Sequence, residues 1–148
     1  MPSSSHHMLF MEAVQTRLQA LTLTGLSSSN ITIREMVTDK NLSASAIQIA
    51  PYGAETITDA TNIREDIGYP SIVAIIAKGE TTSPTLDQRL LWREQVRAAL
   101  HKVDLSSIPD CHELRVTPYN VVEIGALMNS KTWVSAFLVR AFCREVRT

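Results

Sequence analysis

The 148-residue sequence has few of the residues that build specialised sites. Its five glycines stand singly, so no glycine-rich segment is present to cradle a phosphate group. The two cysteines, Cys111 and Cys143, do not form the paired Cys or His spacings of a structural zinc site. The longest purely apolar run, Ile72 to Ala77, is too short to cross a membrane. We therefore expect no metal site, no cofactor and no membrane contact.

The charge balance also lacks an excess of either sign. Fourteen Lys and Arg residues stand against fifteen Asp and Glu residues, and this balance does not indicate a nucleic-acid or anionic-membrane partner. Hydrophobic residues make up 45% of the chain, which is typical of a globular protein. We expect a single domain over residues 8–148, preceded by a flexible tail over residues 1–7 that includes an inert His6-His7 pair. A reducing intracellular compartment would keep both cysteines as thiols without a functional role.

Two segments have the periodicity of amphipathic helices. The first runs from Met8 to Thr24, and Gly25 stands where a helix C-cap is expected. The second runs from Pro84 to about Val103 and has Ser83 as its expected N-cap. Leu18 and Leu90 are central to the apolar stripes of these helices, so we expect both in the core.

The rest of the chain predicts strands. The expected strands are Ile31 to Met36, Ala46 to Ala50, a short piece at Thr56 to Thr58, Ile63 to Ala77, His112 to Thr117, and Thr132 to Val146. Pro70 cannot donate a ladder hydrogen bond, so we expect an edge position or a bulge there. A loop from Pro118 to Lys131 should join the last two strands. The order α-β-β-(β)-β-α-β-β predicts an α+β domain with two helices packed on a mostly antiparallel sheet.

The sequence offers no specific catalytic constellation. It has no G-x-S-x-G nucleophile elbow. Cys111-His112 and Glu65-Asp66 are adjacent pairs within strands, and adjacent strand residues point to opposite faces. We therefore expect a protein that is not an enzyme and has no catalytic residues.

Three arginines of the second helix form the most conspicuous charged feature. Arg89, Arg93 and Arg97 stand at i, i+4 and i+8, which predicts one basic ridge beside the apolar stripe. A solvated face, a subunit contact and a nucleic-acid contact are all open readings of such a ridge. Together with Tyr119 and Trp133, which flank the long loop before the last strand, this ridge is the candidate interface with a subunit or partner.

Three features of the chain carry a resemblance to a known family. They are the order of elements, the strand and turn from Ala46 to Glu55 followed by the long strand Ile63 to Ala77, and Trp133 at the opening of the last strand. Over Met8 to Val146 the chain resembles the tail terminator, or tail completion, proteins of long-tailed bacteriophages. It is similar to the same extent to ring proteins of the phage neck that share this architecture.

The resemblance implies a structural virion protein of the tail or neck, assembled in the host cytoplasm. Such a protein forms a ring, typically a hexamer, that caps the tail tube, halts its polymerisation and meets the head connector. Its partners would be further copies of itself, the tail tube protein and the neck proteins, without a specific nucleic-acid contact. Two alternatives are a small α+β enzyme or ligand-binding module with a pocket built from scattered residues, and a nucleic-acid-binding adaptor that uses the arginine ridge.

Overall fold

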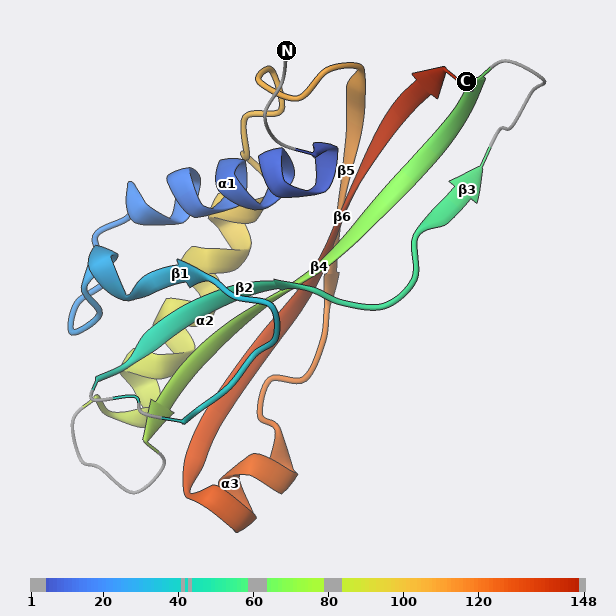
Figure 1. The fold of residues 1–148 in the computed structure, drawn as a ribbon. Helices are drawn as coiled ribbons and strands as arrows, with labels where there is room; N and C mark the ends of the chain where they lie inside the picture. The colour runs from blue at the N-terminus through green and yellow to red at the C-terminus, as the bar shows by residue number, and fades with distance from the viewer. Residues whose placement is uncertain (1–4, 41, 43, 59–63, 79–83, 147–148) are drawn as a thin grey trace.

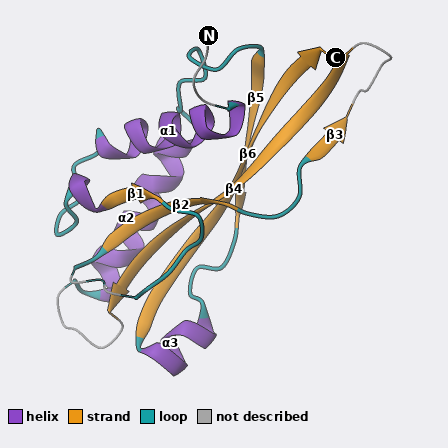
Figure 2. Ribbon diagram, viewed as in Figure 1, coloured by secondary structure: helices purple, strands orange, loops and turns teal. Residues whose placement is uncertain are grey.

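The computed structural model describes residues 5–40, 42, 44–58, 64–78 and 84–146. Helices and strands alternate irregularly along this part of the chain (Figures 1 and 2). The elements are α1 (His6–Gln19), the short helix η1 (Ser28–Asn30), β1 (Ile31–Ile33), β2 (Ala46–Pro51), β3 (Thr56–Thr58), β4 (Arg64–Lys78), α2 (Leu86–Leu100), β5 (Cys111–Pro118), α3 (Ile124–Ser130) and β6 (Thr132–Val146).

The strands form one six-stranded sheet in the order β1-β2-β4-β6-β5, with β3 also paired to β4. All of these pairings are antiparallel except that between β1 and β2. β4 and β6 are each 15 residues long and pair from end to end, and they cross the whole molecule side by side (Figure 1). The prediction of an α+β fold with a mostly antiparallel sheet is confirmed.

The two faces of the sheet are covered differently. The helix face, which includes Val73, Ile75 and Phe137, packs against α1 and α2 in the main hydrophobic core. The opposite face, here called the open face, carries a smaller apolar cluster that includes Ile72 and Ala136. On this face the buried Gln48 exchanges two 2.8 Å hydrogen bonds with the backbone of Thr38, which holds the segment after β1 over the cluster.

The first helix begins earlier than the sequence predicts. Ser5 is its N-cap, because the Ser5 hydroxyl accepts a 3.1 Å hydrogen bond from the Met8 amide. The expected flexible tail over residues 1–7 is therefore wrong for Ser5, His6 and His7, and its first four residues lie outside the described residues. The helix ends at Gln19 with Ala20 as C-cap, so Gly25, at a φ of +85°, belongs to the following turn instead.

The second helix begins at Leu86 with Thr85 as its N-cap, and the expected cap Ser83 lies outside the described residues. Leu18 is fully buried, as predicted, but the prediction that Leu90 is buried is wrong, because its side chain is 38% exposed. The buried stripe of α2 runs instead through Arg89, Trp92, Arg93, Val96, Ala99 and Leu100. Trp92 helps to set this rotation, since its indole N–H donates a 2.9 Å hydrogen bond to the Thr24 carbonyl.

Pro70 lies within β4, and the pairing with β6 continues through Pro70 and Arg140 without a register shift. The expected bulge is therefore absent at this position. β4 as a whole lies between other strands, but Pro70 falls between the stretches paired to β2 and to β3, so on that side it has the expected edge position. The Pro70 carbonyl accepts a 3.1 Å hydrogen bond from the Tyr52 amide, just beyond the end of β2. In an antiparallel strand the N–H and C=O of one residue point to the same side. The missing N–H of Pro70 therefore faces the gap between β2 and β3, where no ladder bond is lost.

The remaining differences lie at element ends and in one connection. The strand expected over Ile31 to Met36 ends at Ile33, whereas β6 has the bounds predicted for it. The loop expected over Pro118 to Lys131 contains a third helix, α3, so the element order is only partly as predicted. Across the described ranges, no helix is both long and apolar enough to span a membrane.

Candidate functional site

Arg93, at the centre of the expected arginine ridge, is buried with only 7% of its surface exposed. Its guanidinium lies 4.1 Å from the centre of the Phe137 ring and donates hydrogen bonds to oxygen acceptors on the β5–β6 connection and on β6. The acceptors are Tyr119 O (3.2 Å), Asn120 O (3.1 Å), Ser135 Oγ (2.6 Å) and Ala136 O (3.0 Å). Burial lowers the pKa of Arg93, and the charge of Arg97 adds to this shift. Arg93 therefore holds α2 to the start of the connection that contains α3.

Arg89 and Trp133 are also inside the protein. The Arg89 guanidinium donates to the Lys78 carbonyl and lies 5.9 Å from the centre of the buried Trp133 ring. The prediction of an exposed ridge is therefore wrong for Arg89 and Arg93, because backbone oxygens and aromatic rings take the place of water around them. Arg97 and Tyr119 remain at the surface, and their part in an interface stays a prediction.

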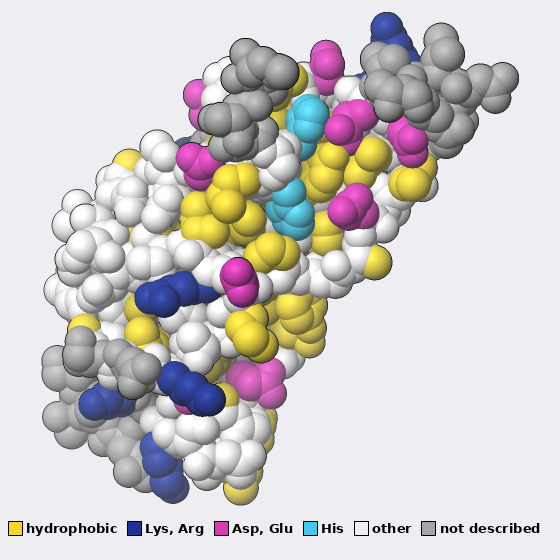
Figure 3. Space-filling model, viewed as in Figure 1, with side chains coloured by type: hydrophobic (Ala, Val, Ile, Leu, Met, Phe, Trp, Pro, Cys, Tyr) yellow, Lys and Arg dark blue, Asp and Glu magenta, His cyan; other side chains and the backbone are white. Residues whose placement is uncertain are grey.

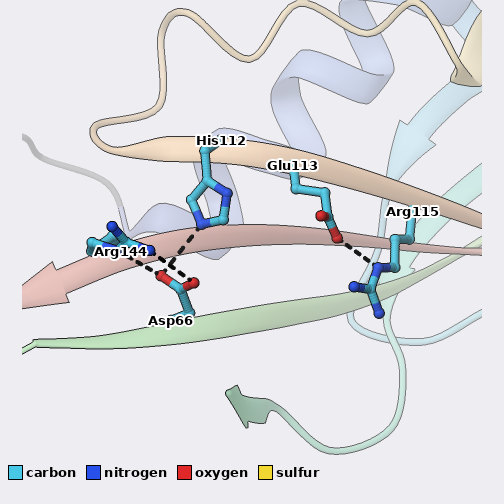
Figure 4. A network of polar contacts seen from close by, with 5 residues as sticks. All are labelled: Asp66, His112, Glu113, Arg115 and Arg144. Carbon is cyan, nitrogen blue, oxygen red and sulfur yellow. Dashed lines mark hydrogen bonds and ion pairs between the residues drawn. The ribbon is translucent and has the colours of Figure 1, made fainter. Parts of the chain in front are cut away.

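A network of charged side chains crosses β4, β6 and β5 on the open face (Figure 4). Arg144 Nε lies 3.1 Å from Asp66 Oδ1, and Arg144 Nη2 lies 3.4 Å from Asp66 Oδ2. His112 Nε2 lies 3.3 Å from the same Asp66 Oδ1. These neighbours, Arg144 first, hold the pKa of the Asp66 carboxyl below its usual value. These contacts connect the start of β4, the end of β6 and the start of β5.

The network continues along β5 with an ion pair between Glu113 and Arg115 at 2.6 Å (Figure 4). Arg115 lies 4.7 Å from the centre of the Phe142 ring and stands directly opposite Arg140 in the pairing of β5 with β6. Arg140 donates a 3.5 Å hydrogen bond to the Ala54 carbonyl. Among the described residues no carboxylate lies within ion-pair distance of Arg140. Like charges placed opposite each other on neighbouring strands repel. A negative charge added beside these two arginines would therefore be electrostatically favourable.

A cavity of about 350 Å³ lies beside these two arginines on the open face. Its apolar floor includes Pro70, Leu138 and Phe142, and the segment after β2 contributes Tyr52 and Thr56. Arg115 and Arg140 are the charged side chains in its described lining. The cavity is therefore apolar at its floor and positively charged at its rim.

Tyr52 also contacts Tyr119 beyond the cavity. The two hydroxyl oxygens are 3.4 Å apart and the ring centres 6.1 Å apart. The hydrogen bond with Tyr52 is the main cause of a raised pKa at Tyr119. Tyr119, which the sequence places in the candidate interface, thus supports one wall of this cavity through Tyr52.

A second cluster joins the start of α1 to the helix face. The Tyr69 hydroxyl donates to the Glu145 carboxylate, and His6 Nδ1 lies 3.3 Å from Glu145 Oε1. His7 Nε2 lies 3.0 Å from Ser71 Oγ. Burial lowers the pKa of His7, whereas burial and the bond to Glu145 raise the pKa of Tyr69. Histidine side chains lie beside acidic and hydrophobic ones near the N-terminal end of α1 (Figure 3).

The two cysteines are unlinked and face each other in the pairing of β5 with β6. A hydrogen bond from the Cys143 thiol lowers the pKa of Cys111 and raises that of Cys143. The described residues contain no group of three or more His, Cys, Asp or Glu side chains arranged to hold a metal ion.

Family models and curated proteins give no significant match to this chain. The geometry alone therefore selects the cavity beside Arg115 and Arg140 as the candidate site. Neither arginine belongs to the set that the sequence singles out. Strand pairing brings them together from positions 25 residues apart, and no motif marks that pairing in advance.

Proposed function

We propose that this chain is a ring-forming structural protein at the head-proximal end of a bacteriophage tail. In this role it terminates the tail tube and joins it to the head connector. Its partners are further copies of itself, typically in a hexamer, the tail tube protein and the neck proteins. The proposal rests first on the resemblance of the chain to tail terminators, and the α+β fold with long antiparallel strands is compatible with it.

The structural observation that carries the proposal is a set of exposed apolar side chains at one end of the sheet. Leu86 and Leu90 project from the start of α2, and Ile124 and Met128 project from α3. Both helices reach the end of the molecule where β4 ends and β6 begins (Figure 1). Exposed apolar surface of this kind is typical of a protein that associates with others. A ring needs such surfaces, because each subunit meets the next head to tail and the rotation closes the circle.

The test combines a mass measurement with a tube-growth assay. Light scattering of the purified chain, alone and with tail tubes of the same phage, should give a mass several times 16.4 kDa in at least one condition. Tubes supplied with the chain should stop elongating and carry a ring at one end in electron micrographs. A ring that binds the head connector but leaves tube growth unchanged would assign the chain to the neck instead. Continued tube growth with a chain that stays at 16.4 kDa would contradict both roles.

The two alternatives differ in their support. A nucleic-acid-binding adaptor depends on the arginine ridge, and burial removes Arg89 and Arg93 from that surface. A ligand-binding module is favoured by one specific observation, the cavity with two arginines on its rim. Ligand binding and ring formation are compatible in one protein, since the cavity and the exposed residues of α2 and α3 involve different side chains.

A further inference from the structure

We propose that the open-face cavity beside Arg115 and Arg140 binds a carboxylate group carried on an apolar body. This inference is independent of the proposed role in tail assembly.

The positive rim of the cavity comes from strand pairing. Arg115 and Arg140 are directly opposite each other on β5 and β6, and both line the cavity. Glu113 pairs with Arg115 at 2.6 Å, which neutralises one of the two charges. Within the described residues, Arg140 donates one 3.5 Å hydrogen bond, to the Ala54 carbonyl, and no carboxylate is within ion-pair distance of it. A carboxylate at this rim would balance the remaining charge of Arg140 and accept charge-assisted hydrogen bonds from its guanidinium.

The position of Arg140 depends on Gly68 of β4. A Cβ atom added at Gly68 would lie 2.8 Å from Arg140 Cδ and 2.7 Å from Phe142 Cε1. The missing side chain therefore lets the Arg140 stem and the Phe142 ring pack closely over β4. Arg115 is held as well, because its guanidinium stacks 4.7 Å from the centre of the Phe142 ring. Both charged groups are thus positioned by packing before a ligand arrives, which reduces the entropy cost of binding.

The floor of the cavity determines which kind of group attached to the carboxylate can bind. Pro70, Leu138 and Phe142 present apolar surface below the two arginines. An inorganic anion would leave this surface wet, whereas a hydrophobic group attached to the carboxylate would cover it. The volume of about 350 Å³ is enough for a small aromatic or aliphatic acid.

Isothermal titration calorimetry tests the proposal with phenylacetate as the probe. Phenylacetamide has the same shape without the charge, and inorganic phosphate has the charge without the apolar body. We expect saturable binding of phenylacetate, and roughly tenfold or more weaker binding of the amide and of phosphate, because each lacks one of the two interactions. Equal affinity for phenylacetate and either comparison compound would overturn the proposal, and so would no binding of phenylacetate.

Variants locate the site. Arg140→Gln should weaken phenylacetate binding roughly tenfold or more. Arg34→Gln removes an exposed arginine that bonds to Thr32 and should leave binding unchanged. Arg115→Gln is the second variant, because it tests the rim from β5 if Arg140→Gln fails to fold. Wild-type affinity in folded Arg140→Gln and Arg115→Gln would show that the probe binds elsewhere and would overturn the proposal.

The carboxylate could come from a free acid or from an acidic side chain of a second copy of the chain. Light scattering with saturating phenylacetate distinguishes these sources. A free-acid site leaves the mass of any oligomer unchanged, whereas a site filled by a neighbouring copy releases that neighbour. Both results require that phenylacetate occupies the cavity. A chain that fails to form a ring but binds phenylacetate would contradict the proposed function and leave the cavity proposal intact.

Discussion

At the scale of single residues, Arg93 is a cation taken out of water with oxygen acceptors around it. Losing the hydration of a charged group is costly unless polar groups in the protein replace it. Here three backbone carbonyls, one hydroxyl and the face of Phe137 take that role. The same contacts attach α2 to the connection between β5 and β6. Arg93, which the sequence periodicity places in an interface, is therefore a buried side chain that holds parts of the same chain together.

Replacing Arg93 tests this role directly. Arg93→Leu should lower the free energy of unfolding by about 2–4 kcal/mol, because several buried oxygens would lose their donor. Arg97→Leu, one turn further along α2 at an exposed position, should change it by less than about 0.5 kcal/mol. Urea unfolding of both variants and the wild type gives the comparison. Equal effects of the two substitutions would show that Arg93 is not buried in solution.

Asp66 gives a second prediction at this scale, through its response to pH. Hydrogen bonds from Arg144, with a further contribution from His112, lower the pKa of its carboxyl in the folded protein. The unfolded chain therefore takes up the proton at a higher pH than the native state does. The stability that Asp66 contributes is present above its unfolded pKa of about 3.9 and is lost as the pH falls through its lower native pKa.

Asp66→Asn should accordingly be less stable than the wild type at neutral pH, and the difference should shrink at pH values below about 4. Urea unfolding across this range measures the difference. Glu94→Gln removes one negative charge at an exposed position of α2 and serves as the control. If the difference in unfolding free energy between Asp66→Asn and the wild type stays constant at all pH values, the lowered pKa of Asp66 in the folded protein is contradicted.

At the scale of elements, the rotation of α2 decides which leucines contribute to the core. Leu18 of α1 is fully buried, so Leu18→Ala should cost about 2–5 kcal/mol of unfolding free energy. Leu90 of α2 is 38% exposed, so Leu90→Ala should cost less than about 1 kcal/mol. Thermal and urea unfolding of the two variants measures both values. A large loss in Leu90→Ala would mean that α2 is rotated as the sequence periodicity predicts.

The sequence predicts some elements well for identifiable physical reasons. The apolar residues spread over both faces of the segment that follows the expected loop place β6 with its observed bounds. Leu18 is placed in the core because the apolar stripe of α1 has no competing residues. These successes concern segments whose hydrophobic pattern has a single interpretation.

The failures concern residues whose environment is supplied by distant segments. Periodicity assigns Leu90 to the core and Arg93 to the surface, but the acceptors of Arg93 lie 26 to 43 residues away and are unknown until the chain folds. The short helix α3 lacks a side-chain hydrogen bond at its N-cap Glu123, and its C-cap is Lys131 rather than glycine, so it has no local start or stop signal. The cavity is missed for a related reason. Its two arginines meet only through the register of β5 with β6.

At the scale of the whole molecule, the question is which surface associates with other copies. Ile124 and Met128 are at i and i+4 in α3, so they share one face of that helix, and both are exposed. Val121, just before the helix, is exposed as well. Met36 is equally exposed, at 71% against 71% for Met128, but it stands beside the exposed charged residues Arg34 and Glu35. The two methionines therefore differ in their surroundings and not in their exposure.

This difference provides a matched test of self-association. If α3 is part of a subunit interface, Met128→Glu should raise the dissociation constant of the oligomer roughly tenfold or more, since burying a methionine side chain contributes about 1.5–3 kcal/mol. Met36→Glu makes the same chemical change at the same exposure and should leave the dissociation constant unchanged. Neither substitution should alter the thermal midpoint of the subunit by much, because neither side chain is buried in it. Sedimentation equilibrium over a range of concentrations measures the association, and equal behaviour of the two variants would remove α3 from the interface.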